Sequence, residues 1–323
     1  MEKVNKTESF SKIDIQSLAL YIGAVLIFIT FTILCGAYGK SFFTLDNMKN
    51  IINQSAVIAV IAIGQSIVIL TGGIDLSVGS IVGFVGIAGG LLLKSGMPLM
   101  MVIGVVIICG CIIGFANGYF VSFGKVPAFI VTLGSMQIIH GLTMVLNTGR
   151  PVSGFPSELR MVVSAKIMGI PISIIYVFLL YAIMITVMKK TTLGRWIYAI
   201  GGNANAAKLA GVKTKQIEML AYVFGGLFAS IGGIFLLSRL SYADPNAGMG
   251  YELDVIAAVV IGGIALSGGK GSIGNTLVGS LILGMLKCGL QILNVPVYFQ
   301  TIIIGITIIV AVYLDKAKER KAE

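Results

Sequence analysis

Long apolar stretches separated by short polar ones dominate this sequence of 323 residues. A helix that crosses a membrane needs about 20 apolar residues, and ten stretches reach or approach that length. The predicted spans are residues 17–38, 51–70, 80–93, 97–120, 127–146, 167–188, 217–240, 253–267, 271–290 and 297–314. The third and eighth are short, so we expect them to be broken or re-entrant. The pattern predicts an all-α polytopic membrane protein of about ten transmembrane helices.

The composition agrees with a membrane protein, and the distribution of charge predicts how the chain is oriented in the membrane. Hydrophobic residues make up 57% of the chain and charged residues 11%, whereas a soluble domain is about a quarter charged. The net charge of +10 follows from topology, because most of the 23 Lys and Arg residues fall on one side when the N-terminus is placed inside. We therefore expect no nucleic-acid partner. The expected organisation is a cytoplasmic segment 1–16, a membrane domain 17–314 and a basic cytoplasmic tail 315–323.

Two short internal echoes bear on whether the chain is a repeat. V-P-A-F at 126–129 recurs as V-P-V-Y at 295–298, and the two copies fall on opposite sides of the membrane, as an inverted five-plus-five repeat requires. G-G-I-D-L-S at 72–77 recurs as G-G-I-A-L-S at 262–267, but both copies fall on the same side. An inverted repeat is therefore one interpretation, supported by the first echo alone.

The stretch T-G-G-I-D-L-S-V-G-S, residues 71–80, places Asp75 in an apolar run. As one helix, residues 50–93 would be about 66 Å long, about twice the hydrocarbon thickness, so the chain must turn there. Gly72 and Gly73 are the expected turning point, and Asp75 or Ser77 can cap the next helix. We place Asp75 near the cytoplasmic ends of these helices, where burial costs less. Alternatively, Asp75 lines the transport path or an inner gate, since carboxylates within membranes are functional candidates.

Other polar side chains in the predicted spans are further candidates for a path or gate. They are Ser77, Asn117, Thr132, Gln137 and His140. Gln137 and His140 are three residues apart and share a helix face, although a structural histidine is the simpler interpretation of His140. Asn117 precedes Gly118, the last glycine of two overlapping G-x-x-x-G units in 110–118, which predict close helix packing.

No catalytic, metal or nucleotide site can be built from the sequence. The four cysteines lie in apolar runs, and the single histidine has no ligand cluster around it. S-G-G-K-G-S at 267–272 fails as a P-loop, because Ile264 and Gly271 occupy positions that require Gly and Ser or Thr. We expect no catalytic residue and no bound cofactor, and we disfavour an enzyme. Any ATP and Mg²⁺ would bind to a partner subunit.

Two long connections are candidate functional segments: residues 147–166 outside and 189–216 inside. In the inner one, Asn203 can cap a short helix that Gly211 ends. Small residues at 204, 206, 207 and 210 would present a low knob on it. A short helix of this kind suits docking into a groove of a partner protein, and a plain surface helix is the alternative.

Five motifs, in order, resemble one family. They are T-G-G-I-D-L-S-V-G-S (71–80), P-A-F-I-V-T-L-G (127–134), G-R-P-V-S-G-F-P (149–156), G-R-W-I-Y-A-I-G-G-N-A-N-A-A-K-L-A-G (194–211) and I-G-G-I-A-L-S-G-G-K-G-S-I-G-N-T (261–276). Together they resemble the membrane permease of ribose-type sugar ABC importers, whose substrates include ribose, xylose, galactose and autoinducer-2. The match covers almost the whole chain.

The resemblance implies partners and site residues. The implied partners are a second permease copy or a paralogue, a cytoplasmic ABC ATPase, an extracytoplasmic sugar-binding protein and the lipid of a bacterial cytoplasmic membrane. The implied residues for coupling to the ATPase are Gly201, Gly202, Asn203, Ala206, Ala207, Lys208, Leu209 and Gly211. Arg150, Glu158 and Arg160 are candidates for docking the binding protein.

The expected function is import of a monosaccharide, most simply a pentose such as ribose, by alternating access driven by the partner ATPase. The main alternative is an ion-coupled secondary transporter. Such a protein usually carries several membrane charges for coupling, whereas we expect this chain to offer essentially Asp75 alone. An exporter or channel on the same scaffold is a further alternative, which dependence on a binding protein would distinguish.

Overall fold

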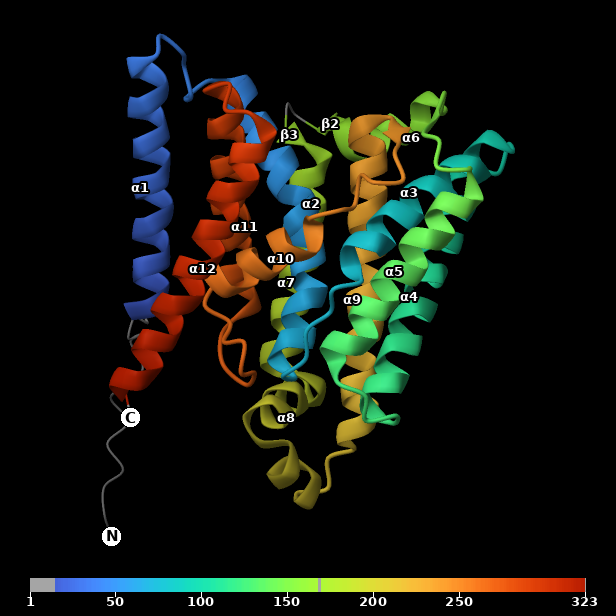
Figure 1. Cartoon of the computed structure of the whole chain (residues 1–323), viewed down its shortest axis with the longest axis vertical. Helices are drawn as coiled ribbons and strands as arrows, with labels where there is room; N and C mark the ends of the chain where they lie inside the picture. Colours follow the sequence, from blue (N-terminus) through green and yellow to red (C-terminus); the bar gives the residue numbers. More distant parts are fainter. Residues whose placement is uncertain (1–14, 168–169, 323) are drawn as a thin grey trace.

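The computed structural model describes residues 15–167 and 170–322 as one bundle of helices (Figure 1). The helices are α1 (Ile15–Ala37), α2 (Leu45–Leu70), α3 (Val78–Lys94), α4 (Leu99–Ser122), α5 (Ala128–Leu146), α6 (Ser157–Ser164), α7 (Ile172–Lys190), α8 (Thr192–Leu209), α9 (Thr214–Leu240), α10 (Tyr251–Ile261), α11 (Ile273–Ile292) and α12 (Val297–Ala322). The strands are β1 (Val152–Ser153), β2 (Lys166–Ile167), β3 (Ile170–Pro171) and β4 (Tyr242–Ala243). Strand β1 pairs antiparallel with β4, and β2 with β3.

Each of the ten predicted spans corresponds to a helix, namely α1–α5, α7 and α9–α12. Seven helices in the described part of the chain are long and apolar enough to cross a membrane. As expected, α3 and α10 are short, with 17 and 11 residues. Two helices were not predicted as spans: α6, in the connection 147–166, and α8, in the connection 189–216. They lie at opposite ends of the bundle (Figure 1).

Helices α3 and α10 each follow a turn in the chain and a stretch of non-helical backbone. Helix α2 ends at Leu70, Gly72 turns the chain with φ +88°, and α3 begins only at Val78. Helix α9 ends at Leu240, and the chain runs back into the bundle before α10 begins. In Figure 1 these two turns lie at opposite ends of the bundle. The glycine breakpoint predicted after α2 is confirmed.

The two halves of the chain run in opposite directions. The short third helix of the first half, α3, matches the short third helix of the second half, α10 (Figure 1). The two V-P pairs precede α5 and α12, the fifth spans of each half, at opposite ends of the bundle. This order and direction of helices is what an inverted five-plus-five repeat requires, with α1–α5 in one half and α7 and α9–α12 in the other.

Helix α2 is the centre of the core. Every residue from Ala56 to Leu70 is buried, because other helices surround this part of α2 on all sides. Helix α9 packs between α2 and α4, and its backbone touches Gly110, Gly114 and Gly118 of α4. A Cβ at any of these glycines would overlap α9, so the predicted close packing is confirmed. Outer helices such as α4 and α5 expose large apolar side chains, as a lipid-facing or partner-facing surface does.

Candidate functional site: a bent helix, a buried carboxylate and an outer rim

Helix α8 consists of two parts joined at a bend at Asn203. Asn203 has φ −160° and ψ 99°, which are not helical angles. Its side-chain oxygen accepts a hydrogen bond from the backbone N–H of Ala206 at 2.9 Å, which caps the second part. Gly211 follows the end of α8 with φ +85°, a conformation that favours glycine. The predicted cap and stop are both confirmed.

The second part of α8 exposes small and polar residues and one large apolar residue. Gly202, Asn203, Ala206, Lys208 and Gly211 are exposed, and Leu209 is 90% exposed. The first glycine of the motif, Gly201, is half-buried against Leu70 and Gly269.

The position of Ala207 differs from the prediction that it is one of the small residues exposed on this helix. It is 6% exposed, and its carbonyl oxygen accepts a hydrogen bond from the N–H of Val212 at 3.0 Å. This bond folds the chain after α8 back against the helix, and the Ala207 side chain belongs to the hydrophobic core and not to the outer face. The exposed alanines are Ala204, Ala206 and Ala210.

Asp75 is held in the non-helical stretch before α3. One carboxylate oxygen, Oδ1, accepts hydrogen bonds from the backbone N–H of Ser77 at 2.8 Å and from its hydroxyl at 2.6 Å. The hydroxyl oxygen of Ser77 accepts in turn from the side-chain amide of Asn117 on α4 at 2.9 Å. The Thr132 hydroxyl of α5 lies 3.2 Å from the carbonyl oxygen of Ile74 and 2.9 Å from that of Ala128, and it can donate to either. Four of the six path or gate candidates, Asp75, Ser77, Asn117 and Thr132, therefore lie together.

Gln65 completes this cluster and was not predicted from the sequence. With its amide oriented to suit its neighbours, Gln65 donates to the carbonyl oxygen of Asp75 at 3.1 Å and accepts from the N–H of Asp75 at 3.3 Å. It thus replaces the helical partners that the backbone of Asp75 lacks. The only sequence signal was a side-chain amide, next to Ser66, within the largely apolar run before Thr71.

One expectation about Asp75, that it or Ser77 caps α3, is wrong, and a second, that its burial costs little, is corrected. Its carboxylate bonds the N–H of Ser77, which precedes α3, and Ser77 itself makes no side-chain cap bond, so neither residue caps the helix as predicted. Asp75 is also fully buried, at 0% exposure. The chain rises into the bundle after Gly72, so Asp75 reaches Gln65, which lies five residues, or about 8 Å, before the end of α2. Its burial is therefore costly.

Two buried polar atoms of this cluster have no hydrogen-bond partner among the described residues: Oδ2 of Asp75 and the hydroxyl of Tyr222 on α9. The tyrosine hydroxyl lies against Gly73, where a Cβ would overlap it. A Cβ on Gly225 of α9 would be 3.2 Å from Oδ2 of Asp75. The stretch 71–77 is thus packed closely against α9 by two residues without side chains.

Gln137 and His140 do not join this cluster. Gln137 is exposed on α5, and His140 is half-buried one turn further along the same helix. Thr132, also on α5, is the residue that reaches the Asp75 segment. Helix α5 therefore turns one polar residue toward the bundle and another toward its surroundings.

The three candidates for docking a binding protein are exposed at the end of the bundle opposite to α8 (Figure 1). Arg150 precedes β1, while Glu158 and Arg160 lie on α6. The connection that carries them is folded, because β1 pairs with β4 and the Ser238 hydroxyl of α9 donates to the carbonyl oxygen of Leu159 at 2.7 Å.

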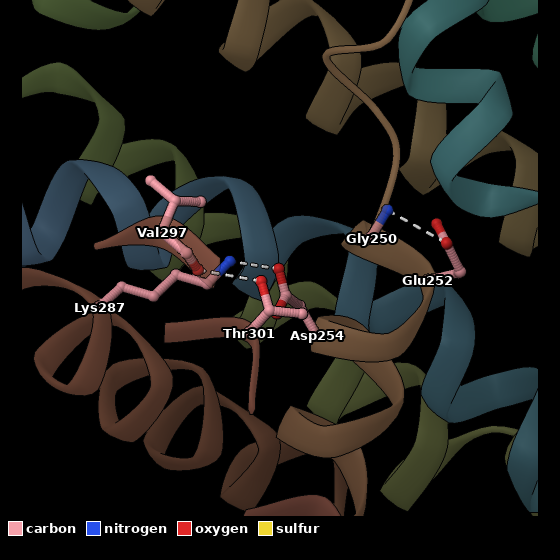
Figure 2. A network of polar contacts seen from close by, with 6 residues as sticks. All are labelled: Gly250, Glu252, Asp254, Lys287, Val297 and Thr301. Carbon is pink, nitrogen blue, oxygen red and sulfur yellow. Dashed lines mark hydrogen bonds and ion pairs between the residues drawn. The ribbon is translucent and has the colours of Figure 1, made fainter. Parts of the chain in front are cut away.

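A charged network around α10 corrects the expectation that Asp75 is the one evident charge of the spans. Figure 2 shows Lys287 of α11 paired with Asp254 of α10, while the N–H of Gly250 donates to Glu252. Asp254 is 6% exposed, and the Lys287 ammonium also lies 5.6 Å from the centroid of the Tyr251 ring. The two charges are 33 residues apart in predicted neighbouring spans, so only the packing of α10 on α11 reveals the pair.

A family model described as "Branched-chain amino acid transport system / permease component" matches residues 47–312. The chain belongs to this family of membrane permeases. It is 41% identical over 278 residues to the ribose import permease RbsC of Haemophilus influenzae, covering 85% of this chain and 86% of that protein. The RbsC of Bacillus subtilis is 39% identical over 305 residues, 94% of both chains. The D-allose permease AlsC of Escherichia coli is 37% identical over 277 residues, 85% of both.

These relatives confirm the resemblance to ribose-type sugar permeases, and no solved structure is significantly similar to the chain. The permease is a multi-pass protein of the inner membrane, as its apolar helices and its family indicate.

Proposed function

We propose that this permease is the membrane subunit of an ATP-driven importer for ribose or a closely related monosaccharide. The observation that carries the proposal is identity of about 40% to ribose import permeases from two organisms over most of the chain. The D-allose permease matches at 37%, so other monosaccharides are the nearest alternative substrates.

The two ends of the bundle support different partners. Basic residues gather around α8, including Lys189, Lys190, Arg195, Lys208 and Lys213. A membrane protein keeps such residues on the cytoplasmic side, so α8 faces the cytoplasm in this proposal. A cytoplasmic ATPase then docks on the second part of α8, where Leu209 is exposed among small side chains. The binding protein docks at the other end, on Arg150, Glu158 and Arg160.

In this proposal the permease works as a pair with a second copy or a paralogue. Helix α5 exposes Gly134, Gln137 and Gly141 at helical spacing, and a Cβ on either glycine would meet nothing within 4 Å. A second subunit can approach such a surface closely. The sugar path lies between the two subunits and opens to each side in turn, while ATP and Mg²⁺ bind to the ATPase.

Uptake by the reconstituted complex tests the proposal. The permease, with its ATPase inside proteoliposomes and the sugar-binding protein outside, should accumulate labelled ribose only when ATP is enclosed. Excess unlabelled allose and xylose measure the selectivity. Uptake driven by a proton or sodium gradient without the ATPase would show an ion-coupled transporter and refute the proposal.

A further inference from the structure

Three separate segments meet beside the bend of α8, and each brings a Gly-Gly pair. The pairs are residues 72–73 after α2, 201–202 in α8 and 268–269 after α10. We use the name glycine junction for Gly72, Gly201, Gly268 and Gly269, in which Gly268 lies against both Gly72 and Gly201, and Gly269 lies against Gly201. The junction lies directly beside Asn203, where α8 bends.

The contacts at the junction are between backbones. The N–H of Gly269 donates to the carbonyl oxygen of Leu70, the last residue of α2, at 3.0 Å. A Cβ on Gly268 would lie 2.9 Å from the nitrogen of Gly72 and 3.2 Å from the Cα of Gly201. A Cβ on Gly201 would overlap both the Leu70 carbonyl oxygen and the Gly269 nitrogen. No flexible side chain separates these segments, so a displacement of one must displace the others.

A side-chain bond reinforces the junction. The Tyr198 hydroxyl of α8 donates to the carbonyl oxygen of Gly271 at 2.9 Å. A tyrosine hydroxyl is protonated at neutral pH, and burial raises the pKa of this one further, so it can donate this bond. The first part of α8 is therefore tied to the loop that follows α10.

The junction leads to both short helices. Beyond Gly72, the stretch 71–77 is bonded to Gln65 of α2, Asn117 of α4 and Thr132 of α5, and it enters α3 directly. On the other side, Gly268 and Gly269 belong to the loop between α10 and α11. One contact thus joins α8 to the segment before α3 and to the segment after α10.

We infer that the glycine junction transmits movement of α8 to the short helices α3 and α10. Gly201 is then a positioning residue for the segments that lead to these helices, and it does not merely shape the docking surface. The inference rests on the proposed docking of an ATPase on α8. When the ATPase displaces the second part of α8, Gly201 pushes or releases the turn at Gly72 and the loop at Gly268. The stretch 71–77 carries that displacement into the bundle as a unit, because its hydrogen bonds fix it internally.

Gly201→Ala in the complete importer tests the inference. The matched control is Gly104→Ala on α4, because a Cβ on this glycine would meet nothing within 4 Å and the residue lies on neither proposed docking surface. Membrane content of the permease, retention of the ATPase on purification, ATP hydrolysis and ribose uptake are measured for each variant. We expect Gly201→Ala to retain the ATPase and hydrolyse ATP, but to import about tenfold less ribose per ATP. Gly104→Ala should keep the wild-type ratio.

Several results would overturn the inference. An unchanged import ratio in Gly201→Ala refutes it alone, while a wild-type complex without ATP-driven uptake refutes the proposed function with it. Loss of ATPase binding in step with transport would mean that Gly201 only shapes the docking helix. If Gly201→Ala does not reach the membrane, Tyr198→Phe decides, since it removes only the bond to Gly271. We expect it to lower the import ratio several-fold, and an unchanged ratio refutes the inference.

Discussion

Lys287 of α11 forms an ion pair with Asp254 at the start of the short helix α10, inside a bundle whose composition is overwhelmingly apolar. Asp254 is buried, whereas about a quarter of the Lys287 side chain is accessible. The pair ties a helix that does not span the bundle to one that does. The contribution of this ion pair to the stability of the permease can be measured by removing one of its two charges.

Lys287→Met should destabilise the permease by about 3 kcal/mol, because it leaves the Asp254 carboxylate buried without its cation. Thermal unfolding of the detergent-solubilised protein measures the change. The double variant Lys287→Met with Asp254→Asn removes both charges and should recover much of the stability. A single variant as stable as wild type would show that Asp254 has another compensating partner.

Asp75→Ala should reduce transport and the amount of permease in the membrane. Removing Oδ1 leaves both the N–H and the hydroxyl of Ser77 without that acceptor, at about 1–3 kcal/mol for each buried group. Asp75→Asn keeps one acceptor oxygen and should retain more activity than Asp75→Ala. The measurements are ribose uptake and quantification of the protein in membranes. Wild-type uptake by Asp75→Ala would make this carboxylate dispensable.

Leu209→Asp should abolish retention of the ATPase while the permease stays folded. Leu209 is almost fully exposed, so a charge at this position would be buried only in the contact with a docked partner. Leu45→Asp is the matched control, since Leu45 is 80% exposed at the opposite end of the bundle. Co-purification with the ATPase and thermal unfolding are the two measurements. Normal retention in Leu209→Asp would place the docking surface elsewhere.

Ala207 and Gly211 are poorer sites for that test, although both are among the coupling residues that the resemblance implies. A bulky charge at Ala207 enters a buried position, and any side chain at Gly211 is strained by the positive φ. Both substitutions should therefore disturb α8 itself. A loss of ATPase binding in either variant would not separate docking from local unfolding.

Arg160→Glu should raise the concentration of loaded binding protein needed for half-maximal uptake, if the outer rim docks that protein. Exposed charges steer association, so the defect should shrink as salt is raised. Arg150→Glu should act in the same direction. The basal ATPase activity without binding protein should not change. Equal dependence on binding protein in all variants would remove these residues from the docking surface.

The span pattern was predictable because the membrane demands long apolar helices, and that demand acts on each segment separately. The same holds for the cap at Asn203 and the stop at Gly211, which depend on neighbours a few residues away. Gln65 and the Asp254–Lys287 pair could not be found in this way, since their partners lie on other elements. The burial of Ala207 likewise depends on how α8 packs on the hydrophobic core.

The non-helical stretches 71–77 and 241–250 matter for an apolar protein whose proposed substrate is a sugar. Helical backbone is already satisfied by its own hydrogen bonds and offers a polar solute nothing. Where the helices are interrupted, carbonyl and amide groups become free to bond with side chains, as Ile74 does with Thr132 and Asp75 with Gln65. Hydrogen-bonding capacity in the interior of this permease therefore comes partly from its main chain, a resource that amino-acid composition does not count.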